Sequence, residues 1–141
     1  MNKKKKILLF LAGVILVVSL ALFMDYLQYL NTQPTEIENI TIEIKEGTLT
    51  RTGATVIITD LSKKINTYSN EYRIDQKMNG RWKILKGNGS WSDLVPPSPD
   101  RNNQIVTEFN WESEYGELKP GEYRIATPVN SDYIAVEFTI K

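Results

Sequence analysis

The chain contains no cysteine and no histidine among its 141 residues. Without cysteine it has no disulfide, no thiolate nucleophile, no cysteine-ligated zinc and no cysteine for lipid attachment. Without histidine it has no Ser-His-Asp triad, no histidine-bound metal and no imidazole acid–base group. These absences exclude most hydrolase mechanisms, so we expect no enzyme activity, no cofactor and no metal.

Outside residues 3–6, the sequence has no comparable run of lysines or arginines. The chain has 17 Lys and Arg against 17 Asp and Glu, and residues 3–6 are all lysine. The remainder is therefore mildly acidic. Nucleic-acid binding requires a basic face, so we expect no nucleic-acid partner.

An uncharged apolar run covers residues 7–24, between the lysines and Asp25. A helix that spans a bilayer needs about 20 apolar residues, and this run is apolar on every face, unlike a helix packed on a soluble core. It predicts a transmembrane signal anchor and a single span of the lipid bilayer. Lysines stay on the cytoplasmic side, which makes residues 1–6 a cytoplasmic tail and places the C-terminal domain outside the cell membrane.

Whether this segment is cleaved is left open by the sequence. Residues 19–21 have the small-x-small pattern of a signal peptidase site, and removal of residues 1–21 would secrete the domain. The apolar run is longer than the about 7–15 residues of a signal peptide, and Tyr26 and Tyr29 are placed as interfacial anchors. We favour an uncleaved anchor followed by a juxtamembrane linker over residues 25–35.

From residue 36 onward the apolar pattern has a period of two and indicates β-strands without a soluble helix. Asn79-Gly80 predicts a type I′ hairpin, and we expect Trp82 and Ile84 on its return strand to face the core. About seven strands over residues 36–141 favour an antiparallel Ig-like or fibronectin-III-like β-sandwich, with a small barrel as the alternative. The expected strands cover residues 40–45, 54–60, 71–78, 81–85, 104–111, 122–129 and 132–140.

A structural corner is predicted near the C-terminus by Leu118, Pro120, Gly121 and Tyr123. In β-sandwiches, a tyrosine at the start of a strand after such a turn packs its ring in the core. Its hydroxyl then bonds to nearby backbone, which makes a tyrosine corner. We expect this corner to hold the fold together and to carry no binding.

Three stretches together resemble a known family: Gly-Ala-Thr-Val-Ile-Ile-Thr-Asp at residues 53–60, Asn-Gly-Arg-Trp-Lys at residues 79–83, and Tyr-Gly-Glu-Leu-Lys-Pro-Gly-Glu-Tyr-Arg at residues 115–124. They resemble the bacterial immunoglobulin-like domains of Gram-positive membrane-anchored or secreted proteins. The resemblance covers roughly residues 36–141 and implies a sandwich domain outside the cell. Such domains usually have no known activity, so it carries over no catalytic residue.

The candidate contact residues lie in loops. Trp91 and Leu94 fall in a Gly- and Pro-rich loop, where they either anchor the loop or contact a partner, and Tyr68 in the previous loop is a candidate to join them. We expect a protein-interaction or structural module at the cell surface, with an unidentified protein or cell-wall partner. The alternative is a cell-wall carbohydrate-binding module that uses these loop aromatics.

Two other constellations have functional interpretations that we consider weaker than the structural ones. Ser62 next to Lys63 is the pairing of a serine–lysine dyad, but adjacent loop residues point in different directions, which favours a solvated loop. Five glutamates near the corner suggest a calcium site, but their spacing matches no EF-hand loop, so we favour solvated surface acids. They are Glu108, Glu112, Glu114, Glu117 and Glu122.

Overall fold

The computed structural model describes residues 2–88 and 95–141. The chain divides into two compact units, Met1–Gln33 and Pro34–Lys141, which we describe separately. The first unit contains α1 (Lys3–Asn31), and the second contains all the strands and a one-turn helix. The elements of the second unit are β1 (Ile40–Ile44), β2 (Gly53–Asp60), β3 (Arg73–Met78), β4 (Arg81–Ile84), β5 (Gln104–Asn110), α2 (Glu112–Tyr115), β6 (Gly121–Val129) and β7 (Asp132–Ile140).

Helix α1 is apolar around its whole circumference. The Asn2 side chain accepts a hydrogen bond from the backbone N–H of Lys4 and caps the first turn. The helix ends at Asn31, shortly before Pro34, which disfavours a helical conformation in the residue that precedes it. Lys3–Leu27 is long and apolar enough to cross a membrane, and it contains the predicted segment 7–24.

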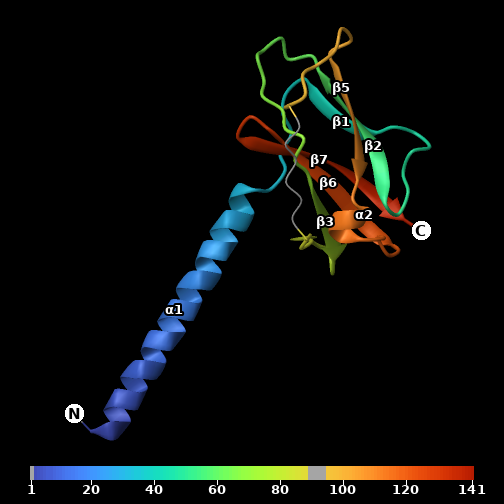
Figure 1. The fold of residues 1–141 in the computed structure, drawn as a ribbon. Helices are drawn as coiled ribbons and strands as arrows, with labels where there is room; N and C mark the ends of the chain where they lie inside the picture. Colours follow the sequence, from blue (N-terminus) through green and yellow to red (C-terminus); the bar gives the residue numbers. More distant parts are fainter. Residues whose placement is uncertain (1, 89–94) are drawn as a thin grey trace. The chain divides into compact units, whose positions relative to one another are not determined.

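Two antiparallel sheets form the second unit (Figure 1). One has the strand order β1-β2-β5 and the other has the order β4-β3-β6-β7. The β-branched strand β2 is central in its sheet, and alternate residues along it are buried. The seven-stranded antiparallel sandwich predicted from the sequence is confirmed.

The core lies between the two sheets and is built around aromatic rings. Trp111 is fully buried, with its ring centroid 5.9 Å from that of Phe138, and Tyr123 stacks with Phe138 at a centroid distance of 5.7 Å. The Trp111 indole Nε1 donates to the Arg51 carbonyl, 2.8 Å away. The core position predicted for Tyr123 is therefore confirmed.

The inward orientation predicted for Trp82 and Ile84 is wrong. Asn79 and Gly80 have φ values of 51° and 75°, as a two-residue type I′ turn requires, and this turn pairs Lys77 with Trp82. Cross-strand partners share a face of the sheet. Trp82 consequently lies with Lys77 on the outward face, and Ile84, paired with Asp75, is 41% exposed there.

Helix α2 is a second departure from expectation, since no helix was predicted after residue 36. It is a single turn that follows Trp111, with Glu112 and Glu114 in its first turn and Gly116 at its end. Gly116 has a φ of 72°, a left-handed conformation that glycine adopts without steric cost. The turn carries the chain from β5 toward the predicted corner.

Candidate interaction surface

The outward face of the four-stranded sheet carries an ion-pair cluster, which we call the Arg–Asp–Arg cluster, made of Arg73, Asp75 and Arg124. Asp75 on β3 is fully buried although its side chain leaves the sheet on the side away from the core. Arg73 Nε donates to Asp75 Oδ1 at 3.0 Å, and Arg124 Nε donates to Oδ2 at 2.7 Å. Register explains the second contact, because Arg124 on β6 is the direct cross-strand partner of Asp75.

Aromatic rings hold the two arginines from the flanking strands. The Arg124 guanidinium carbon lies 4.7 Å from the centroid of the Trp82 ring, and that of Arg73 lies 4.7 Å from the centroid of Tyr133. Trp82 belongs to β4 and Tyr133 to β7, so all four strands contribute to the surface. Lys77 Nζ also lies 5.6 Å from the Trp82 centroid. Planar guanidinium groups stack on aromatic faces in this way, which fixes their orientation.

The chemistry of this surface suits recognition. The two guanidinium groups of Arg73 and Arg124 share the single carboxylate of Asp75. The guanidinium groups are poor general bases, and stacking on rings restricts their movement. The arrangement fixes the two arginines and the carboxylate beneath aromatic rings, with only 13% and 9% of the Arg73 and Arg124 side chains exposed.

Of the three predicted partner contacts, Trp91, Leu94 and Tyr68, the structure describes only Tyr68. Trp91 and Leu94 lie outside the described residues. Tyr68 is only 4% exposed, so its ring offers no stacking surface to a partner. The reason is a hydrogen bond that the sequence does not reveal, from Tyr68 Oη to Asp60 Oδ2 at 2.6 Å. An isolated bridge to Val129 fixes the Tyr68 backbone as well.

Asp60 is the centre of a polar network, the Asp60 network, which also includes Tyr68, Asn66 and Ser62. Asn66 Nδ2 donates to Asp60 Oδ2 at 2.9 Å, and the Ser62 backbone N–H donates to Oδ1 at 2.8 Å. Burial opposes ionisation of Asp60, but the hydrogen bonds from Ser62, Tyr68 and Asn66 outweigh it and hold the pKa of Asp60 below its ordinary value. The same burial and the Asp60 charge raise the pKa of Tyr68. Ser62 therefore belongs to a loop-fastening network.

The corner residues adopt the geometry of a tyrosine corner. Tyr123 Oη donates to the Lys119 carbonyl at 2.8 Å, and Leu118 is buried beneath the turn. A Cβ on Gly121 would come within 3.3 Å of the Tyr123 ring, so glycine lets the turn approach the ring closely. Pro120 precedes this glycine and is exposed.

The glutamates near the corner do not converge. Glu108, Glu112, Glu117 and Glu122 are exposed, and Glu117 and Glu122 pair with Arg51 and Lys77 respectively. Within residues 2–88 and 95–141, no three acidic side chains gather closely enough to hold a metal ion.

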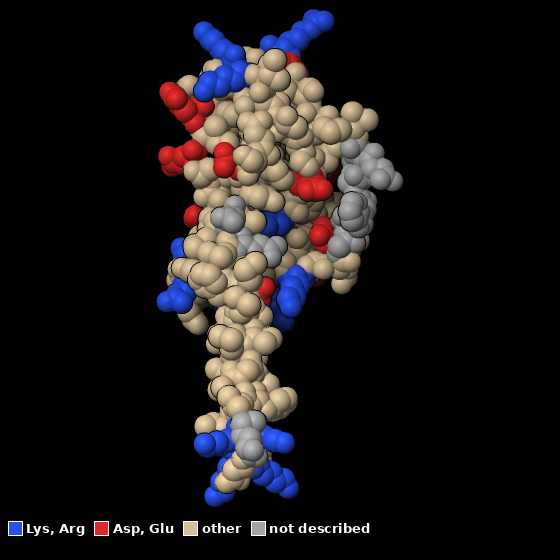
Figure 2. Space-filling model, turned by 90° about the vertical axis from the view of Figure 1, so that its left-hand side faces the viewer, with Lys and Arg blue, Asp and Glu red and all other residues tan. Residues whose placement is uncertain are grey.

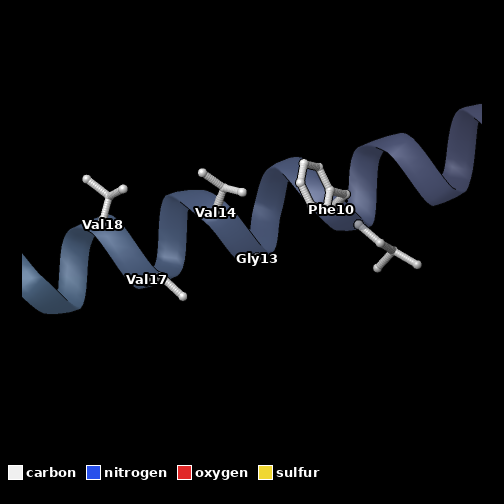
Figure 3. A pocket seen from close by; sticks show the side chains of 6 residues that line it. Phe10, Gly13, Val14, Val17 and Val18 are labelled. Atoms are coloured by element: carbon white, nitrogen blue, oxygen red, sulfur yellow. The ribbon is translucent and has the colours of Figure 1, made fainter.

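A shallow apolar groove of about 380 Å³ runs along α1, with Gly13 at its floor (Figure 3). Its walls are Leu9, Phe10, Val14, Val17 and Val18. No polar group lines it, so it suits hydrocarbon contact and offers no specific recognition.

Comparison with known protein families matches residues 36–139 to a family described as "Bacterial Ig-like domain". The chain belongs to this family. Comparisons with curated proteins and with solved structures gave no match. The matched range is nearly all of the second unit, Pro34–Lys141, so the sandwich is the Ig-like domain. Ig-like domains are typically non-catalytic.

No property of single residues in the sequence indicated the Arg–Asp–Arg cluster. Arg73 and Asp75 do alternate along one strand, and an aspartate two residues from an arginine on the same face is a weak signal of an ion pair. The orientation of Trp82 could also be predicted from the turn. Met78 and Arg81 flank a two-residue hairpin loop, which makes Trp82 the cross-strand partner of Lys77. The contribution of Arg124 required knowledge of which strand lies beside β3.

Proposed function

We propose that this protein is a single-pass membrane protein that presents its Ig-like domain at the outer cell surface as a protein-interaction or structural module. The observation that carries the proposal is the direct succession, in one chain, of clustered lysines, an uncharged apolar helix and an Ig-like domain. Figure 2 shows the lysines gathered at the free end of α1, next to a stretch of helix without charge. Such lysines favour retention on the cytoplasmic side.

The linker between the helix and the domain is short in this proposal. Asn31 ends α1, and Thr35 already bonds to the sandwich through its N–H, which donates to the Tyr133 carbonyl at 2.7 Å. A chain extends by at most about 3.6 Å per residue, so the domain is tethered within about 15 Å of the helix end. The module therefore acts close to the membrane.

Topology can be tested with single cysteines, because the natural chain has none. We expect a membrane-impermeant maleimide to label Glu108→Cys in intact cells, and to label Lys5→Cys only after the membrane is opened. Both variants should float with membranes at the mass of the uncleaved chain. Labelling in the opposite order would contradict the topology, and a released protein that begins after residue 21 would contradict the anchor.

The interaction role can be tested from the outward sheet face. A photo-crosslinking residue at Ile84, exposed on the outward side of β4, or at Glu137, exposed on the outward side of β7, should capture a discrete partner in native membranes. The matched control is Val106 on β5, which is exposed in the other sheet. Equal capture from Val106 and from the sheet face would contradict a specific surface.

The carbohydrate-binding alternative loses its structural support. It requires exposed, coplanar loop aromatics, and Tyr68 is buried with its hydroxyl engaged by Asp60. We therefore propose only the interaction or structural role.

A further inference from the structure

Strand β7 forms an open edge of the four-stranded sheet. It covers nine residues, Asp132–Ile140, and its pairing with β6 is continuous from Val129↔Asp132 to Gly121↔Ile140 without a bulge. Proteins usually block such edges with short strands, proline, lysine or bulges. The opposite edge of the same sheet is blocked in this way, because β4 has only four residues and carries Arg81 and Lys83. None of these features protects β7.

The backbone groups along β7 that face outward can be identified from one hydrogen bond. The Tyr133 carbonyl accepts from the Thr35 N–H at 2.7 Å and therefore points away from β6. In an antiparallel strand, residues whose backbone groups face the neighbour alternate with residues whose groups face outward. Ala135, Glu137 and Thr139 thus share the orientation of Tyr133, and within residues 2–88 and 95–141 their outward groups have no hydrogen-bond partner.

A groove of about 690 Å³ runs beside this edge. Residues 35–42 line one side, and Ile134 and Ala135 of β7 line the other. Ile40 and Ile134 are buried and Ile42 is partly buried, so the groove has apolar side chains within reach of a strand laid on β7. Side chains on one face of such a strand would enter the groove.

Charge indicates the kind of strand that fits. Glu36 and Glu38 are exposed in the groove wall, which contains no lysine or arginine. Glu137 is exposed on β7, and Asp132 is exposed at its start. A second copy would bring the same acids against these, which like-charge repulsion disfavours. A cationic strand is complementary.

We propose that the β7 edge binds an extended, cationic peptide segment of a partner protein by strand addition. The segment donates and accepts backbone hydrogen bonds along Ala135, Glu137 and Thr139. It places small apolar side chains in the groove and lysine or arginine next to the carboxylates. This inference rests on the proposed interaction module and specifies the chemistry of its partner.

The test uses the full chain in lipid nanodiscs and a capped, fluorescent nine-residue peptide in which lysine and valine alternate. Binding is measured by fluorescence anisotropy. We expect saturable binding that weakens as salt is raised, and no binding of the matched glutamate–valine peptide. Amide hydrogen exchange of Ala135, Glu137 and Thr139 should slow when the peptide is bound. Equal binding of both peptides would overturn the proposal.

Two variants identify the surface. Ala135→Pro removes an outward N–H without removing a bond to β6, and we expect it to weaken peptide binding at least about tenfold. Glu38→Lys should weaken it at least about fivefold, whereas the same charge change at Glu108 on β5 should alter it less than about twofold. Urea denaturation verifies that each variant is folded, and Glu38→Lys decides the matter if Ala135→Pro does not fold.

Two results would overturn the proposal: peptide affinity unchanged in Glu38→Lys, or a dimer in the absence of peptide that Ala135→Pro abolishes. The second would assign the edge to another copy of the chain. Peptide binding in nanodiscs does not depend on which side of the membrane the domain faces. Failure here is therefore separate from failure of the cysteine-labelling experiment.

Discussion

Asp60 and Asp75 are both buried carboxylates of the Ig-like domain, yet their surroundings differ. Asp60 at the end of β2 is held by neutral donors, namely Tyr68, Asn66 and the Ser62 backbone N–H. Asp75 in the middle of β3 is held by two arginines. The first arrangement keeps its negative charge within hydrogen bonds and fastens a loop, whereas the second places an ion-paired carboxylate between two arginines on the outward sheet face.

The difference indicates which site is built for structure and which for presentation. Neutral donors satisfy a carboxylate at low cost and leave nothing further to recognise. Desolvated ion pairs often contribute little net stability compared with apolar residues of the same size. We therefore propose that the Arg–Asp–Arg cluster, placed outside the core and framed by Trp82 and Tyr133, serves recognition more than folding.

Asp75→Asn should produce the largest effect. It leaves Arg73 and Arg124 without the charge that compensates them, so we expect the free energy of unfolding to fall by about 3–5 kcal/mol. Urea denaturation followed by tryptophan fluorescence measures this loss. Joint replacement of Arg73 by Met, Asp75 by Leu and Arg124 by Met should recover most of it. If the triple variant is as unstable as Asp75→Asn, the cluster is a structural element after all.

Acidification should weaken the Asp60 network. The pKa of Asp60 is lowered in the folded state, so its contribution to stability is complete above the unfolded pKa of about 4 and is lost as pH falls through the folded pKa. The loss should exceed that from removing any single donor, because protonation weakens all three hydrogen bonds. The difference in unfolding free energy between the natural chain and Asp60→Asn should be largest near neutral pH. A difference independent of pH would contradict this assignment.

Tyr68→Phe should have an intermediate effect. The hydroxyl donates to a charged acceptor at 2.6 Å, and such bonds contribute about 1.5–3 kcal/mol. The loss is measured by urea denaturation at neutral pH. It should shrink in acid as Asp60 takes up its proton, and persistence of the full loss at low pH would show that packing is responsible.

Tyr123→Phe should have the smallest effect of the series. Its hydroxyl donates to the neutral Lys119 carbonyl at 2.8 Å, which is worth about 0.5–1.5 kcal/mol. The effect should be independent of pH below the titration of tyrosine, unlike that of Tyr68→Phe. Binding of the lysine–valine peptide should be unchanged, since the buried Tyr123 ring and its hydroxyl contact the core and the Lys119 carbonyl and not the outward backbone groups of β7. Loss of binding at unchanged stability would make the corner a binding site.

Much of the fold could be predicted because its signals are local. The apolar run, the two-residue turn at Asn79 and Gly80, and the order from Leu118 to Tyr123 each depend on a few neighbouring residues. The orientation of Trp82 was also predictable, since a two-residue turn places it with Lys77. The turn register overrides the hydrophobicity of Trp82 in setting the face on which it lies.

The sequence by itself determined that the chain has an apolar helix long enough to span a bilayer and an antiparallel sandwich closed by a tyrosine corner. Composition and short-range periodicity are sufficient for these features. Only the tertiary structure decided that Tyr68 is buried against Asp60, that Arg124 reaches Asp75 from 49 residues away, and that β7 is left as an open edge. These depend on which strands become neighbours and in which register, and such pairings are set by the packing of the whole domain.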